Sequence, residues 1–165
     1  MGMVIYLRRA SVADIKVLTA DPARVDAFVF EEGDPETDLV EFDKAWHALH
    51  FILTGEAYGS GHPLGIIAGD APKIESAESG FGEFWVLSPD SIAEFAAALE
   101  KIDDRTLAAR IDIDAMVAVD IYIADAFAED DKAEAIEYIM QGVPALRRFA
   151  ASCREAGDGA LRVIA

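Results

Sequence analysis

The chain has 165 residues, of which 31 are acidic and 14 are basic, so its formal net charge is −17 at pH 7. This length suits one domain, and a composition that is 53% hydrophobic supplies the apolar side chains of a buried core. The charge disfavours nucleic-acid and membrane-surface roles, because phosphate backbones and anionic lipids repel it. It is compatible with a basic protein partner, although solubility alone explains the same excess of acids.

The single cysteine indicates the compartment. Cys153 has no second cysteine to pair with in the chain, which favours a reducing environment. Its helical spacing from Leu146 and Phe149 predicts a buried structural thiol. The sequence begins without the pattern of a signal peptide, and no apolar run approaches the length of about 18 residues that a membrane helix needs. We therefore expect a cytoplasmic protein.

The first part of the chain predicts a strand followed by short helices. Residues 4–7 are β-branched, aromatic and aliphatic, which favours a buried strand. Ser11 and Asp14 have the spacing of a capping box, so a short helix is expected to begin there. Pro22 suits the first turn of another helix, and the acidic residues 31–38 then predict a solvated loop.

The most strongly patterned segment is residues 42–55. Apolar side chains recur there at intervals of three and four, which predicts one buried stripe on a helix of about three turns. The stripe consists of Phe42, Ala45, Trp46, Leu49 and Leu53. Gly55 can adopt the left-handed conformation that ends a helix. A polar strip borders the stripe within about 60° on the same helical wheel, and it consists of Asp43, His47, His50 and Thr54.

Two interpretations of this polar strip remain open. In the first, His50 lies at the edge of the core and is hydrogen-bonded to Thr54 or to a carbonyl, while Asp43 and His47 form a weak surface pair. In the second, His50 is a general base or a metal ligand, and Asp43 fixes its tautomer. The familiar helical zinc site has two histidines four residues apart with a Glu beside the first, and neither feature is present here. The sequence assigns no metal, no cofactor and no catalytic residue.

A loop rich in glycine follows this helix at residues 56–65. Its glycines do not form a phosphate-binding loop, because such a loop must follow a strand and open a helix. The loop brings Tyr58 and His62 to the end of the helix that carries His50, so any pocket is expected at this edge. The candidate pocket residues are Asp43, Trp46, His47, His50, Thr54, Tyr58 and His62.

The second half of the chain predicts two central strands and several helices. The apolar runs 66–69 and 84–87 favour the strands, and Ser88 and Pro89 open a long amphipathic helix. Residues 113–127 fit strand and helix equally well and stay unassigned. Further helices are expected after Asp103, after the acids 129–131, and at 144–156 before Gly157. The β-rich residues 161–164 predict a terminal strand, and three aromatic side chains are assigned to the core, Phe81, Trp85 and Tyr122.

A family resemblance rests on the central helix. The run Asp43-Lys44-x-Trp46-x-x-Leu49-His50-Phe51-x-Leu53-Thr54-Gly55, with the opening Met1-Gly2-Met3 and Tyr6, resembles the YfbM-like family of small bacterial proteins. The resemblance extends nearly end to end, to the closing residues 160–164. Position 50 is histidine in the family's pattern, whereas position 47 often is not. The family has no assigned function, so the resemblance implies no catalytic residues.

These observations predict an α+β fold in which residues 1–165 form a single domain with a small mixed sheet of about four strands, covered by helices. The function is not determined by the sequence. Our first hypothesis is a non-catalytic, acidic, cytoplasmic binding or interaction protein with a basic protein partner. The alternative is a small-ligand-binding protein or an enzyme with a pocket beside the helix edge at residues 43–54. The substrate, the partner and the oligomeric state stay open.

Overall fold

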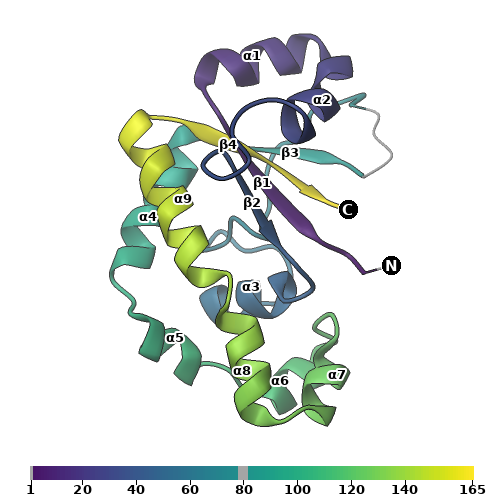
Figure 1. The fold of residues 1–165 in the computed structure, drawn as a ribbon, viewed down its shortest axis with the longest axis vertical. Helices are drawn as coiled ribbons and strands as arrows, with labels where there is room; N and C mark the ends of the chain where they lie inside the picture. The colour runs from purple at the N-terminus through teal and green to yellow at the C-terminus, as the bar shows by residue number, and fades with distance from the viewer. Residues whose placement is uncertain (1, 78–81) are drawn as a thin grey trace.

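The computed structural model describes residues 2–77 and 82–165 and has the predicted α+β architecture (Figure 1). The expected core position of Phe81 lies outside the described residues. In chain order the elements are β1 (Ile5–Ala10), α1 (Val12–Ala20), the 3-10 turn η1 (Pro22–Arg24), α2 (Val25–Phe30), β2 (Leu39–Phe42), α3 (Trp46–Thr54), β3 (Phe84–Leu87), α4 (Pro89–Glu100), α5 (Asp104–Ala109), α6 (Ile113–Ala118), α7 (Ala124–Glu129), α8 (Lys132–Met140), α9 (Val143–Ala156) and β4 (Gly159–Ile164).

The four strands form one sheet in the order β2-β1-β4-β3. All three pairings are antiparallel, so the strand number is as predicted but the prediction of a mixed sheet is wrong. The first pairing shows the reason. The backbone N–H of Arg9 donates to the carbonyl of Asp38, which fixes the residue before β2 at the end of the sheet where β1 finishes. The chain therefore re-enters the sheet in the opposite direction.

One strand lies elsewhere than predicted. β2 pairs Phe42 with Ile5, so Phe42 reaches the core from a strand and not from the helical stripe. Residues 66–69, expected as a strand, form turns instead. The N–H of Gly69 donates to the carbonyl of Gly65, which satisfies that backbone locally, and a Cβ at position 69 would collide with the same carbonyl. The run is apolar because its side chains are buried.

The helix boundaries follow the predicted capping signals. The Ser11 hydroxyl accepts the N–H of Asp14, whose carboxylate accepts the N–H of Ser11, and this capping box opens α1. Gly55 and Gly157 end α3 and α9 with φ of 79° and 70°, which only glycine adopts without strain. The unassigned segment 113–127 contains α6 and the start of α7. In the described part of the chain, no helix is long and apolar enough to cross a membrane.

Helices cover both faces of the sheet, as Figure 1 shows. One face packs with α1 and α2 through an apolar cluster that includes Leu18, Val25 and Val163. The other face packs with α3, α4 and α9 through a larger cluster that includes Trp46 and Phe95. Helices α5 to α8 gather beyond α3 at the lower end of the molecule in this view. Helix α3 therefore lies between the sheet and this helical end.

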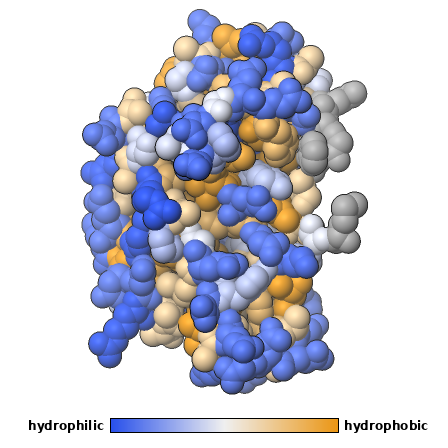
Figure 2. Space-filling view, in the orientation of Figure 1, coloured by the Kyte–Doolittle hydropathy of each residue, from blue (hydrophilic) through white to orange (hydrophobic). Residues whose placement is uncertain are grey.

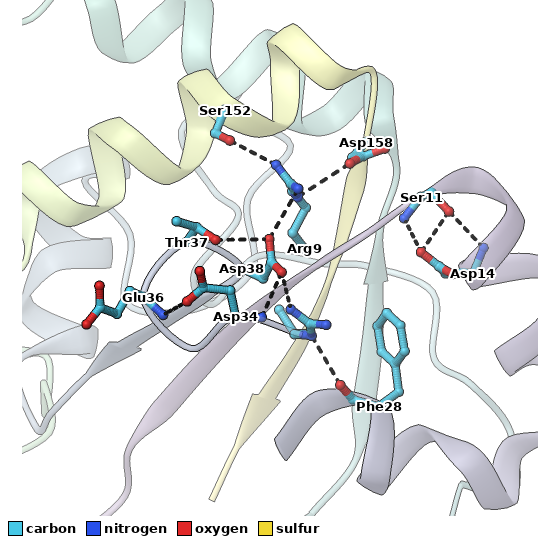
Figure 3. Close-up of polar contacts among 11 residues, drawn as sticks. Arg9, Ser11, Asp14, Phe28, Asp34, Glu36, Thr37, Asp38, Ser152 and Asp158 are labelled. Carbon is cyan, nitrogen blue, oxygen red and sulfur yellow. Dashed lines mark hydrogen bonds and ion pairs between the residues drawn. The ribbon is translucent and has the colours of Figure 1, made fainter. Parts of the chain in front are cut away.

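Two neighbouring arginines of β1 hold the loop before β2 against the sheet (Figure 3). Arg8 is only 5% exposed, its Nε donates to the carbonyl of Phe28, and its guanidinium carbon lies 4.8 Å from the centre of the Phe28 ring. Both arginines form ion pairs with the Asp38 carboxylate, at 3.4 Å from Arg8 and 3.2 Å from Arg9. Arg9 also reaches Asp158 at 3.5 Å. Arg9 of β1 thus joins the loop, through Asp38, to the residue before β4, Asp158.

The Asp38 carboxylate is stabilised in its charged form. The backbone N–H of Asp34 donates to it, and together with the two arginines this hydrogen bond lowers the pKa of Asp38 from its ordinary value. Because the folded pKa lies below the unfolded one, the carboxylate contributes stability above the unfolded pKa. That contribution is lost as the pH falls through the folded pKa.

We predict that Asp38→Ala lowers the free energy of unfolding by about 2 kcal/mol at neutral pH, because two partly buried guanidinium groups lose an acceptor. Urea denaturation measures the difference. The difference should shrink below about pH 4, where the wild-type carboxylate also becomes protonated. Glu36→Ala, an exposed change in the same loop, is the matched control and should leave the unfolding free energy nearly unchanged. A loss of equal size in both variants would contradict the role of the Asp38 ion pairs.

Candidate functional site

The candidate residues of α3 are largely buried. Trp46, His47 and His50 are at most 1% exposed, although His47 and His50 belong to the polar strip. Asp43 is exposed before the helix begins, and Thr54 is half-buried in its last turn. The strip therefore does not form the wall of an open pocket. Its histidines are enclosed by the loop at 57–68 and by the turn between α6 and α7.

Two of the expected hydrogen bonds are absent because other partners are closer. The Asp43 carboxylate accepts the hydroxyl of Tyr138 from α8, which lowers the pKa of Asp43. The surface pair of Asp43 with His47 in the first interpretation and the contact of Asp43 with His50 in the second are therefore both absent among the described residues. The Thr54 hydroxyl donates to the backbone carbonyl of His50 and does not contact the imidazole ring. Asp43 thus fastens the start of α3 to α8, whereas the Thr54 hydrogen bond lies within the helix.

Both ring nitrogens of His47 have backbone partners. Nδ1 accepts the N–H of Tyr122 at 2.9 Å, and Nε2 lies 2.7 Å from the carbonyl of Ala57. An acceptor at Nδ1 and a donor at Nε2 define the neutral tautomer with its proton on Nε2. Burial lowers the pKa of His47, so this neutral form is the stable one. His47 thus joins α3 to the loop on one side and to the α6–α7 turn on the other.

His50 accepts the N–H of Ala68 with its Nδ1 at 3.3 Å. Its Nε2 is buried and has no hydrogen-bond partner among the described residues. Burial, reinforced by the neighbouring His47 and opposed by the nearby backbone of Gly59, lowers the pKa of His50 to about 4. The ring is neutral at physiological pH and its lone pair already accepts a hydrogen bond. This geometry favours the core-edge interpretation over a general base or a metal ligand.

A row of aromatic rings continues outward from the histidines. Trp46 stacks on His47 with centroids 4.9 Å apart and on Tyr122 at 6.1 Å, and His47 contacts Tyr58 at 4.4 Å. The Trp46 indole donates to the carbonyl of Met3, whose N–H donates to the Tyr122 hydroxyl. Tyr58 ends the row and is 63% exposed. Tyr122 belongs to this structural row, which agrees with its assignment to the core.

His62 and Thr54 are the candidate residues that line open space. His62 lines a cavity of about 430 Å³ between the loop at 60–72 and the start of α4. With Thr54 it also lines a hollow of about 330 Å³ at the end of α3, near Arg110. The loop lines these spaces as expected, but the cavity faces β3 and α4, away from the predicted helix edge. No grouping of three or more His, Cys, Asp or Glu suited to a metal ion is found within 2–77 and 82–165.

A groove of about 520 Å³ was not foreseen from the sequence. It lies where α6 faces α7 and the start of α8. Ile111 and Phe127 form its nearly buried floor, and Asp112, Asp114 and Asp130 form an exposed rim with Lys132. The many acidic residues in this segment could have indicated a charged surface. The groove itself could not be predicted, because it depends on the fold of residues 113–127, which was not assigned from the sequence.

The comparisons with known proteins concern the whole chain. A family model described as a domain of unknown function (DUF1877) matches residues 1–163. Among solved structures, the chain is similar to YfbM from Escherichia coli, a protein of unknown function, with a TM-score of 0.71 and 21% identity over 98% of this chain and 99% of that one. Identity at this level shows the fold alone. No curated protein matches the chain in sequence. The YfbM-like resemblance is confirmed.

Protonation of His50 should limit stability in acid. The folded pKa of about 4 lies below the ordinary value of 6.5, so the unfolded chain takes up this proton first as the pH falls. We predict that this group removes about 3 kcal/mol of unfolding free energy between about pH 7 and pH 4. Urea denaturation across this range should give a shallower pH slope for His50→Gln, which cannot titrate. Identical slopes would contradict the lowered pKa.

The Cys153 thiol is predicted to be unreactive in the folded protein. It is fully buried, and burial raises its pKa to about 12, so the nucleophilic thiolate is scarce. A thiol reagent such as DTNB at about pH 8 should label Cys153 only in denaturant. Labelling as fast as that of free cysteine without denaturant would show that the thiol is accessible.

Proposed function

The chain belongs to the DUF1877 family, whose function is unknown, and we propose that it is a non-catalytic protein that binds a basic segment of a protein partner. The supporting observation is the groove beside α6, which combines an apolar floor with an acidic rim. An occupant that matches both features carries lysine or arginine next to an apolar side chain. Such a combination of a buried anchor and surrounding charges is typical of protein interfaces.

The charge around the groove supports a basic occupant. Residues 103–137 contain 11 acidic and 3 basic residues, so this segment carries −8 of the formal charge of −17. Among its described acidic side chains, Asp104 alone forms an ion pair, with Arg147. Hydrophilic side chains cover most of the lower end in Figure 2, where α7 and α8 lie in Figure 1. Carboxylates without a protein cation attract a basic partner at long range and raise its association rate.

The floor of the groove supplies the second part of the argument. Ile111 and Phe127 are 8% and 4% exposed, and Ile113 beside them is half-buried. An apolar side chain inserted here would remove the remaining apolar surface from water, at about 25 cal/mol per Å². Charge attracts the partner, and this apolar contact fixes the position of the bound segment along the groove. A uniformly charged surface would attract a partner without fixing its position.

The remaining parts of the proposal follow from charge and chemistry. A protein with this excess of acids would be repelled by nucleic acid and by anionic membrane surfaces, so we infer that neither is its partner. The lone, buried Cys153 suits a reducing compartment, and we infer a cytoplasmic location. A non-catalytic role is supported by His47 and His50, whose ring lone pairs already accept backbone N–H groups.

We predict that Asp114→Asn with Asp130→Asn weakens binding of a basic peptide about tenfold, since each rim charge contributes about 0.7 kcal/mol. The probe is a fluorescent peptide of alternating lysine and leucine, and its anisotropy gives the Kd. The matched control, Asp90→Asn with Glu155→Gln, removes the same charge from α4 and α9 and should change the Kd less than twofold.

Two further peptides separate the two features of the groove. A lysine-only peptide should bind more weakly than the lysine–leucine peptide, because it lacks the apolar anchor. Raising the salt from about 0.05 M to 0.5 M should weaken both peptides, because exposed charges are screened. Equal loss of affinity in the rim variant and the control would mean that net charge, and not the groove, attracts the peptide. That result would overturn the proposed site.

A further inference from the structure

The cavity between the loop at 60–72 and the start of α4 lies outside the groove and uses other residues. Its volume of about 430 Å³ falls in the range of small-molecule sites. One wall carries Ser60, His62 and Asp70 from the loop, and the facing wall carries Ser91 and Glu94, which lie three residues apart on one side of α4. We propose that this cavity binds a small, uncharged molecule rich in hydroxyl groups, such as a monosaccharide.

The polar groups of the cavity have unused hydrogen-bonding capacity. His62 accepts the N–H of Leu64 with Nδ1, so the ring proton lies on Nε2 and can be donated to a ligand. The Ser88 hydroxyl donates to the Ser91 hydroxyl, which leaves the Ser91 proton free to donate. No described residue donates a hydrogen bond to Asp70 or Glu94, and neither carboxylate forms an ion pair with a described residue. Donors and acceptors thus line the same space, as a ligand with several hydroxyl groups requires.

A buried cation behind the cavity restricts the charge of its ligand. Arg162 is 4% exposed, and its Nη1 donates at 2.8 Å to the carbonyl of Ile66, a residue of the cavity wall. Its Nε has no partner among the described residues, and Asp70 is the acid whose charge acts on it. Asp70 and Glu94 repel an anionic ligand, and the positive charge of Arg162 behind Ile66 counteracts the attraction that these carboxylates exert on a cationic ligand. A neutral ligand depends on neither charge.

The rest of the lining suits the C–H groups of a sugar-like ligand. Ile66 and Leu87 are buried apolar residues at the cavity, and Val86 of β3 is a half-buried one. Pro63 and Pro72 add rigid apolar surface from the loop. Polyhydroxylated molecules combine hydroxyl groups with apolar ring faces, so they match a cavity that has both kinds of surface. A purely polar solute would leave this apolar surface uncovered.

The loop wall is held in one conformation before any ligand arrives. The N–H of Gly59 donates to the carbonyl of Ala68, and the N–H of Gly65 donates to the carbonyl of His62. Ser60 has a φ of 111°, which a residue with a side chain adopts only when its surroundings enforce it. The hydrogen bond from Ala68 to His50 anchors the same loop to α3. A rigid wall reduces the entropy lost on binding.

The test is protein-observed NMR with a matched series of sugars. D-glucose, D-galactose, D-mannose and myo-inositol are the neutral probes, and D-glucosamine and D-glucuronate add a positive and a negative charge to the same ring. We expect at least one neutral probe to shift the amide resonances of residues 60–72 and 88–94 saturably, with a Kd on the order of millimolar for a ligand of this size. Both charged analogues should bind the cavity more weakly than this neutral probe does.

Variants assign the binding to the cavity. Ser91→Ala and Glu94→Gln should each raise the Kd of the neutral probe about fivefold, since the first removes a hydroxyl and the second replaces one carboxylate acceptor with a donor. Asp90→Asn, a change on the same helix outside the cavity, should leave that Kd unchanged. The Asp114→Asn, Asp130→Asn protein should also keep its affinity for the sugar, which separates this site from the peptide groove. Unchanged amide spectra away from the mutated positions verify that the variants fold.

Three results would overturn the proposal. The first is the absence of saturable shifts with all of the neutral probes. The second is tighter binding of D-glucosamine or D-glucuronate than of the neutral sugar, because the charges around the cavity would then select a charged ligand. The third is an equal Kd in the wild type, Ser91→Ala and Glu94→Gln, which would indicate adventitious binding elsewhere on the surface.

Discussion

Two buried imidazole rings hold separate parts of the fold together. His47 accepts the N–H of Tyr122, and His50 accepts the N–H of Ala68, so one short helix fixes the α6–α7 turn and the loop before β3. The loop meets the sheet only near its end, where the N–H of Val86 donates to the carbonyl of Pro72. The α6–α7 turn contains Ile123 with a φ of 57°, which is unfavourable for a β-branched side chain. Contacts with α3 therefore help to fix both segments.

This arrangement links the histidines to both proposed sites without giving them a direct chemical role. The loop bonded to His50 is one wall of the cavity beside α4, and the turn bonded to His47 connects the helices of the acidic groove. Neutral imidazole suits this task because it accepts a backbone N–H in a site where a charged ring would be expensive to bury. Protonation would remove the acceptor and add a buried charge.

The sequence predicted the features that depend on neighbouring residues. The α3 stripe, the capping box at Ser11 and the stops at Gly55 and Gly157 were correct, because spacing along a helix determines them. The antiparallel sheet and strand β2 were missed, because Phe42 continues the helical spacing by coincidence and its strand partner is distant in sequence. The acceptors of the Ala68 and Tyr122 amides were also missed, since a backbone donor carries no signal in residue type.

The most direct test of this account is to determine the tautomers of His47 and His50. Long-range ¹H–¹⁵N NMR correlations of the two rings at neutral pH give them. Both lone pairs are assigned to Nδ1, where they accept the amides of Tyr122 and Ala68. The account predicts neutral rings with the proton on Nε2 in each case. A proton on Nδ1, or a charged ring at either position, would contradict the structural role of these histidines and reopen a catalytic one.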